Sequence, residues 1–201
     1  MAETLVDLMR HGEPEGGSQY RGNRVDDPLS LKGWQQMRDS AGLHAPWQQI
    51  VTSPLKRCHA FADELGCQHN IPVTVIDNLK EVGFGSWEGM TRDQLKASRL
   101  QEYEAFYQDP INNRPEGAEN LQDFFLRVTN AYQSLLNNFA GQHILVVAHA
   151  GVIRAILSHT LLSSLQGMYR IQVDNAGISR INYKQHKGVL IKHNVTMDEL
   201  K

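Results

Sequence analysis

The sequence predicts an α/β fold: a three-layer αβα sandwich with a mostly parallel sheet and helices on both faces. Short apolar runs typical of buried strands alternate along the chain with longer segments of helical apolar spacing. Such alternation is typical of a parallel sheet covered on both sides. The chain has 201 residues and neither an internal repeat nor a low-complexity linker, so we expect one domain over residues 1–201.

Local signals place the elements in order. Residues 4–9 form an apolar run, and residues 12–30 are rich in Gly, Pro and polar side chains, as in a long loop. Ser53 followed by Pro54 suggests an N-cap and a first helical proline, so a helix should begin there and end near Leu65. The other expected helices cover residues 31–43, 121–139 and 151–162, and the other strands residues 50–52, 72–76, 143–148, 171–173, 178–183 and 189–191.

Residues 77–120 are expected to form a mostly helical insertion. Thr91 and Gln94 have the spacing of a capping box that opens a helix, and residues 112–117 are typical of a loop.

Composition excludes several classes of function. The net charge of −2 gives no basic excess for nucleic acid, and no apolar stretch approaches membrane-spanning length. The N-terminus shows no signal-peptide pattern. Cys58 and Cys67 lie in or beside one expected helix, which favours free thiols in a reducing compartment, so we expect a cytoplasmic protein. The sequence leaves the oligomeric state open, a homodimer included.

Histidines and arginines follow several of the expected strands. Arg10 and His11 end the first strand, Arg57 follows the second, and His149 follows the strand at residues 143–148. A lone histidine there is more often structural and a lone arginine more often solvated, but parallel strands bring their carboxyl ends to one edge. Helix N-termini at that edge would add N–H donors, so the pattern predicts a pocket for a dianion.

Other phosphate and metal motifs do not occur. The chain has no G-x-x-x-x-G-K-[ST] segment, no arginine six residues after either cysteine, and no H-E-x-x-H or paired C-x-x-C pattern. We therefore predict no nucleotide P-loop, no cysteine-phosphatase loop, no metal site and no cofactor.

A series of motifs in fixed order resembles the histidine phosphatase superfamily, also called phosphoglycerate mutase-like. The resemblance spans nearly the whole chain. The motifs are Arg10-His11-Gly12-Glu13, Asp27-Pro28-Leu29-Ser30 with Gly33, Ser53-Pro54-Leu55-Lys56-Arg57, Leu79-Lys80-Glu81, Gly85-Ser86-Trp87-Glu88-Gly89, Pro115-Glu116-Gly117-Ala118-Glu119 and Val147-Ala148-His149-Ala150-Gly151.

The resemblance implies a role for each matching position. His11 would be the nucleophile that forms a phosphohistidine, and Glu81 the general acid and then the base that activates water. Arg10, Arg57 and His149 would be catalytic groups that bind the phosphoryl oxygens. Gly12 and Ala150 are further expected phosphate-binding positions. An imidazole must be neutral at one nitrogen to attack, so a backbone carbonyl should hold the other N–H of His11.

The segment after His11 departs from the family pattern. Pro14 and Gly17 stand where many relatives have threonine and a phosphate-holding asparagine. Ser18 or Arg21, in the loop at residues 16–22, are the candidates to replace that contact.

The short chain favours a phosphatase over a mutase. Gly16-Gly17, Tyr20-Arg21-Gly22, Asp26-Asp27 and Gly33-Trp34-Gln35-Gln36 resemble bacterial α-ribazole phosphatases, which implies α-ribazole-5′-phosphate as the small-molecule substrate, in assembly of the cobalamin nucleotide loop. Trp87, together with Phe84, Tyr103, Phe106 and Tyr107, would contact it as an apolar lid, or else pack the insertion onto the core. The alternatives are a broad sugar-phosphate phosphatase or mutase, and a phosphate-sensing module without turnover.

Overall fold

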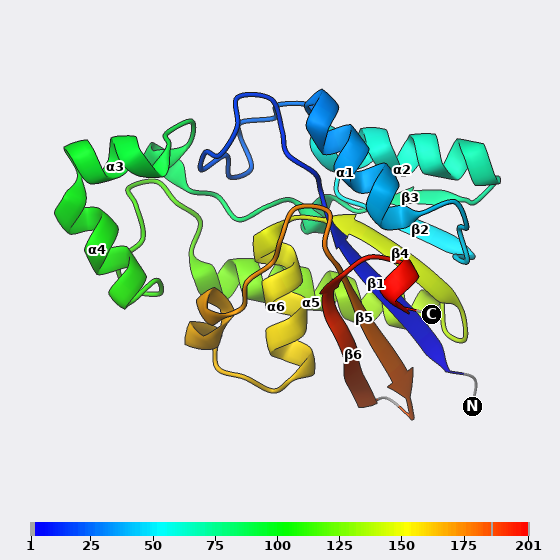
Figure 1. Ribbon diagram of the computed structural model, residues 1–201. Helices are drawn as coiled ribbons and strands as arrows, with labels where there is room; N and C mark the ends of the chain where they lie inside the picture. Colours follow the sequence, from blue (N-terminus) through cyan, green and yellow to red (C-terminus); the bar gives the residue numbers. More distant parts are fainter. Residues whose placement is uncertain (1–2, 186, 201) are drawn as a thin grey trace.

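The computed structural model describes residues 3–185 and 187–200. Its centre is a sheet in the order β3-β2-β4-β1-β5-β6 (Figure 1). In this order the first four strands run parallel to one another, whereas β5 is antiparallel to both of its neighbours, β1 and β6. This arrangement confirms the mostly parallel sheet. The strands are β1 (Thr4–Arg10), β2 (Gln49–Thr52), β3 (Val73–Val75), β4 (His143–Ala148), β5 (Ile178–Lys184) and β6 (Lys187–Val195).

Helices cover both faces of this sheet (Figure 1). On one side α1 and α2 pack against it, and on the other α5 and α6 do, which confirms the three-layer sandwich. The helices are α1 (Leu31–Ala41), α2 (Lys56–His69), α3 (Arg92–Ser98), α4 (Leu100–Gln108), α5 (Leu121–Asn138) and α6 (Ala150–Thr160), with 3₁₀ turns η1 (Asp77–Leu79), η2 (Gly85–Trp87), η3 (Leu165–Arg170) and η4 (Asp198–Leu200).

The central strands bury both of their faces. Leu8 and Val146 face the α5–α6 layer, whereas Met9 and Val147 face the α1–α2 layer, and all four side chains are fully buried. Successive side chains of a strand point to opposite faces, so a strand buried on both sides is continuously apolar. That is why the strand at residues 143–148 was predicted at its observed bounds.

The start of α2 differs from the prediction. The helix begins at Lys56, and its N-cap Leu55 makes no side-chain cap. The Ser53 hydroxyl instead accepts the Leu55 N–H and contacts a ring nitrogen of His149 at 2.7 Å. Ser53 is therefore tied to the end of β4, and Pro54 lies in the turn before the helix. The capping box at Thr91 and Gln94 is confirmed.

The strand predicted at residues 171–173 is wrong. These residues follow η3 as an extended segment outside the sheet. Their carbonyls accept from side chains instead of a neighbouring strand: Ile171 from Arg154, Gln172 from His193, and Val173 from Arg10. The segment thus serves as an anchor for charged side chains.

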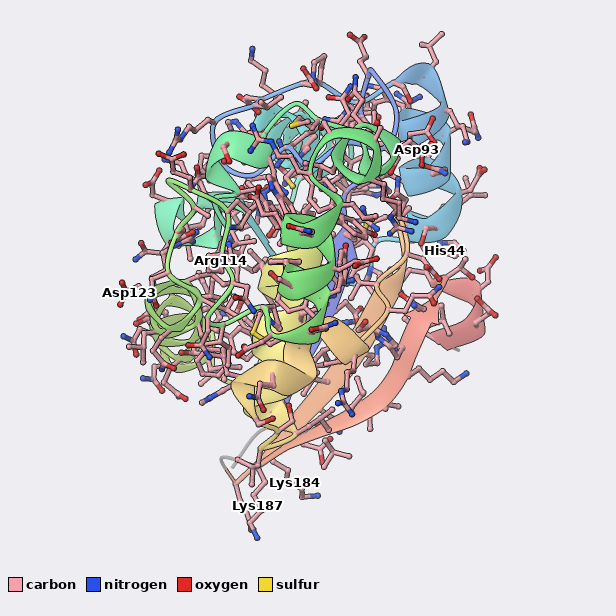
Figure 2. The ribbon with its side chains drawn as sticks, turned by 90° about the vertical axis from the view of Figure 1, so that its left-hand side faces the viewer. His44, Asp93, Arg114, Asp123, Lys184 and Lys187 are labelled. Carbon is pink, nitrogen blue, oxygen red and sulfur yellow. The ribbon has the colours of Figure 1, made fainter. Side chains whose placement is uncertain are left out.

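The insertion lies beside the sandwich with a small core of its own. Trp87, Leu95 and Phe106 are fully buried there, and α3 and α4 extend away from the sheet (Figure 1). In Figure 2, Lys184 and Lys187 mark the β5–β6 hairpin at one end of the molecule and Asp93 of α3 lies at the other, the end where the parallel strands finish. No helix in the described part of the chain combines the length and apolar character that crossing a membrane requires.

Candidate active site

A cavity of about 350 Å³ lies where β1 ends and where α2 and α6, the helices that follow β2 and β4, begin. Its floor brings together residues that lie far apart in the sequence. These are Arg10, His11, Arg57, Glu81, Ala150 and Gly151. The convergence of histidine and arginine at one sheet edge, expected from the strand ends, is therefore observed.

His11 sits between the end of β1 and the start of α6. Its Nδ1 lies 2.7 Å from the Gly12 carbonyl oxygen. A carbonyl can only accept, so Nδ1 carries the proton and Nε2 is left with its lone pair. Burial, followed by the charges of Arg10 and Arg57, holds the pKa of His11 well below its usual value. At neutral pH His11 is thus an uncharged imidazole whose Nε2 carries no proton.

Gly12 shapes this arrangement from behind. It is not part of the cavity wall. A Cβ at Gly12 would overlap the backbone of Gly33, so glycine is needed for the end of β1 to pack against α1. Gly12 therefore orients His11 through its carbonyl, and the expected direct phosphate contact from Gly12 is not what the geometry offers.

Arg10 and Arg57 both place guanidinium groups at the cavity, and the side chain of Arg57 is fully buried whereas that of Arg10 is half-buried. Nη1 of Arg10 donates to the Val173 carbonyl at 2.6 Å, and Arg57 donates to the carbonyls of Gly22 and Val25 at 2.9 and 3.0 Å. Among residues 3–185 and 187–200, the buried Nε atom of each of these two arginines has no hydrogen-bond partner. Burial lowers the pKa of Arg10 to about 10, which leaves it charged at neutral pH. Buried unpaired donors are costly, and an anion would satisfy them.

His149 lies behind His11 and outside the cavity wall. The two ring centroids are 5.2 Å apart, and the His149 side chain is fully buried. Burial, followed by Arg57 and His11, holds the pKa of His149 well below its usual value. Its neighbour Ala150 does line the cavity, at the first residue of α6.

Glu81 is held at the N-terminus of α6. One carboxylate oxygen accepts the Val82 N–H at 2.9 Å, and the other accepts the Gly151 N–H at 3.1 Å. A Cβ at Gly151 would overlap this carboxylate, so glycine at that position gives Glu81 its place. The carboxyl group thereby reaches the same cavity as His11.

Trp87 does not contact the cavity. Its side chain is fully buried, its Nε1 donates to Glu102 at 2.7 Å, and it packs against Phe106 and Tyr103. The cavity wall therefore gives no support to the expected substrate contact from Trp87, and the observed packing of this ring matches the alternative expectation, a role in the core of the insertion. Of the other expected lid aromatics, Phe84 and Tyr107 line the cavity.

Several further residues line the cavity that no sequence motif had indicated. Arg92, Arg154, Tyr20, Tyr169 and Asn175 all line it. Tyr20 and Tyr107 join their hydroxyl groups at 2.6 Å. Arg154 could have been found, because it lies four residues after Ala150 on the same helix and so faces the same side.

Both candidates for the missing asparagine contact, Ser18 and Arg21, line the cavity. Ser18 is exposed. Arg21 is buried, and its Nε, Nη1 and Nη2 donate to Asp27 and to the carbonyls of Gly17 and Glu15. Arg21 is therefore tied into its own loop.

The two buried histidines predict a pH-dependent stability. Their folded-state pKa values are depressed, so below about pH 6.5 the unfolded chain binds more protons than the folded one. The free energy of unfolding should fall as pH drops, by at most about 1.4 kcal/mol per pH unit for each histidine. Urea denaturation between pH 7.5 and 5.5 measures this slope. His149→Gln should remove the contribution of one histidine to the slope of the free energy of unfolding against pH. A slope equal to that of the wild type would contradict this expectation.

The fold and this cavity define an α/β protein with a neutral histidine beside two arginines, Arg57 fully buried and Arg10 half-buried. The family model of the histidine phosphatase superfamily (branch 1) matches residues 6–196, and the chain belongs to this family.

Relatives within the family differ in their named activities. A bifunctional protein of Mycobacterium tuberculosis is 30% identical over 88% of this chain, which spans only 49% of that relative's length. Phosphoserine phosphatase 1 of Hydrogenobacter thermophilus is 27% identical over 94% of this chain and 91% of its own. The crystal structure of the alpha-ribazole phosphatase from Shigella flexneri superposes with a TM-score of 0.82, at 26% identity over 94% of this chain and 96% of that one.

Proposed function

We propose that this chain is a phosphomonoesterase that works through a phosphohistidine at His11. The observation that carries the proposal is the neutral His11 ring. Its Nδ1 proton is held by the Gly12 carbonyl, and its charge-free Nε2 lies beside Arg10 and Arg57. Phosphoryl transfer depends mainly on positioning and charge stabilisation, and these two arginines can supply both.

Each step has a residue in place. The phosphoryl oxygens bind the unpaired N–H groups of Arg10 and Arg57, and His11 Nε2 attacks phosphorus as the bond to the leaving oxygen breaks. Glu81 gives its proton to that oxygen. Glu81 then takes a proton from water, which attacks phosphorus, breaks the P–N bond and releases inorganic phosphate. The ring of His149 packs edge-on against the ring of His11, with centroids 5.2 Å apart, and so helps to fix the orientation of the nucleophile.

The specific substrate proposed is α-ribazole-5′-phosphate. The likeness to the Shigella flexneri alpha-ribazole phosphatase supports it, as do the aromatic side chains of Tyr20, Phe84 and Tyr107 at the cavity, which can stack on a flat ring. Cys58 is buried and Cys67 exposed, both as free thiols, which supports a reducing compartment such as the cytoplasm.

The charge at the mouth favours a second candidate, a phosphate ester with a further negative group. Arg92 and Arg154 line the cavity, and neither forms a salt bridge within the described residues. Glu13 also lines it, but is paired with Lys32. Phosphoserine, the substrate named for one relative, belongs to this class.

Measurement of kcat/KM over a panel of phosphomonoesters tests the proposal. The panel holds α-ribazole-5′-phosphate, phosphoserine, sugar phosphates and p-nitrophenyl phosphate, all with EDTA present. Phosphate release together with a trapped, acid-labile and base-stable phosphohistidine supports the enzyme. A flat profile eliminates the α-ribazole assignment, and preference for phosphoserine selects the second candidate. Activity that requires added metal, or no turnover of any ester, would overturn the proposal.

A further inference from the structure

The loop between β1 and α1 lines the cavity, and its two adjacent glycines, Gly16 and Gly17, have no side chains of their own to hold it. Gly16 and Gly17 both have positive φ angles, 76° and 70°, which glycine adopts without strain. A Cβ at Gly17 would meet nothing within 4 Å, so the loop makes no close packing there. Its backbone bonds include Gly17 N–H to Pro14 and Glu15 N–H to Pro28. Two adjacent glycines carry a large conformational entropy, which some other group must offset.

The side chain of Arg21 provides that group. Its Nη2 donates to the Glu15 carbonyl, its Nη1 to the Gly17 carbonyl at 2.7 Å, and its Nε to Asp27 at 2.9 Å. The side chain is only 6% exposed, although it belongs to a loop. Hydrogen bonds from a charged donor are the strong ones, and a planar guanidinium can hold three acceptors in one arrangement.

The same loop continues directly into the support of Arg57. Gly22, the residue after Arg21, accepts from Nη2 of Arg57 at 2.9 Å, and Val25 accepts from Nη1 at 3.0 Å. The Val25 N–H in turn donates to the Arg21 carbonyl at 3.3 Å. The direction of the unpaired Arg57 Nε therefore depends on where Arg21 holds this stretch of backbone.

We propose that Arg21 is a positioning residue, which fixes the loop at residues 15–25 and thereby aims the guanidinium of Arg57 at the phosphoryl group. Arg21 acts through Arg57, because its own donors are taken up by Glu15, Gly17 and Asp27. The inference rests on the proposed phosphatase function for its kinetic test only.

A double-mutant cycle between Arg21 and Arg57 tests this role. Turnover of p-nitrophenyl phosphate is measured for Arg21→Ala, Arg57→Gln and the double variant. A misplaced catalytic group costs about 10²-fold in kcat/KM, which is the loss expected for Arg21→Ala. In the Arg57→Gln background the same change should cost less than about tenfold, because coupled residues are not additive. An equal loss in both backgrounds would overturn the proposal, as would wild-type kinetics for Arg21→Ala.

Two further variants separate position from charge and from general damage. Arg21→Lys keeps the charge, but one ammonium group cannot hold three separate acceptors, so it should remain impaired; full recovery would mean that charge alone matters. Arg24→Ala is the matched control, since Arg24 is in the same loop, donates its side chain to Gly117 and is absent from the cavity wall. It should stay within about twofold of wild type.

Binding of inorganic phosphate, followed by calorimetry, keeps this test separate from the proposed function. If the wild-type chain turned over no ester, the phosphatase proposal would fail. The positioning role would still predict that Arg21→Ala weakens phosphate binding, and does so only while Arg57 is present. Phosphate affinity unaffected by Arg21→Ala would overturn the inference on its own.

Discussion

Replacement of His11 with alanine should abolish phosphate release and leave no trapped phosphohistidine. Without Nε2 there is no nitrogen to receive the phosphoryl group, and removal of a covalent nucleophile typically costs about 10⁶-fold in kcat. The Gly12 carbonyl would lose its partner as well. Quenched incubation with phosphorus-labelled substrate, followed by kcat measurement, reads both effects.

His44→Ala is the control for this substitution. His44 is exposed, and it does not line the cavity (Figure 2). Its replacement should leave kcat within about twofold. Because His11 is buried, its replacement can also displace the neighbouring side chains. Calorimetric measurement of phosphate binding by His11→Ala shows whether Arg10 and Arg57 are still in place. If a His11→Ala protein that binds phosphate still turned over substrate at the wild-type rate, the nucleophile would be another group.

The sequence predicts the fold well where local signals and burial agree. The strand at residues 143–148 was placed at its observed bounds because both of its faces are buried, which makes the run continuously apolar. The capping box at Thr91 was found because it satisfies helix N–H groups within four residues. Arg10, His11 and Arg57 were predicted to lie close together, because parallel strands have their carboxyl ends at one edge of the sheet.

The features that the sequence did not predict depend on contacts between segments far apart in the chain. Residues 171–173 have strand-like composition, but Arg10 and Arg154 take their carbonyls. Trp87 follows Glu81 closely in sequence, yet the packing of α3 and α4 encloses its ring. No local pattern reveals Arg92 as part of the cavity, because its position depends on how the insertion lies over the sheet. Tertiary packing decides each of these cases.

Replacement of Glu81 with glutamine should slow the hydrolysis of alkyl phosphates far more than the hydrolysis of p-nitrophenyl phosphate. General acid catalysis typically contributes about 10²–10⁴-fold. In the proposed mechanism the leaving alkoxide of an alkyl ester takes its proton from Glu81, whereas p-nitrophenolate is a weak enough base to leave without one. The loss in kcat/KM should therefore lie at about 10²–10⁴-fold for phosphoserine or a ribose phosphate. It should be much smaller for the aryl ester. Steady-state kinetics on the two kinds of ester measure the difference.

Glu13→Gln is the matched control, because Glu13 also lines the cavity but is paired with Lys32. Any change in kcat/KM for Glu13→Gln should be the same for the alkyl and the aryl esters. Glutamine at position 81 also brings an NH₂ group against the N–H of Val82 or Gly151, since both Glu81 oxygens accept from backbone. Phosphate affinity must therefore be measured for Glu81→Gln, to separate a lost proton from a displaced helix end.

The second half of the reaction makes the assignment of Glu81 sharper. In the proposed mechanism the phosphohistidine must be hydrolysed once p-nitrophenolate has left, and the Glu81 carboxylate is the base that activates water for this step. Glu81→Gln should then show a rapid burst of p-nitrophenolate followed by slow turnover, with labelled phosphohistidine accumulating on His11. A role in binding alone would lower burst and steady rates together. Equal losses for aryl and alkyl esters, without accumulation, would assign the acid to another residue.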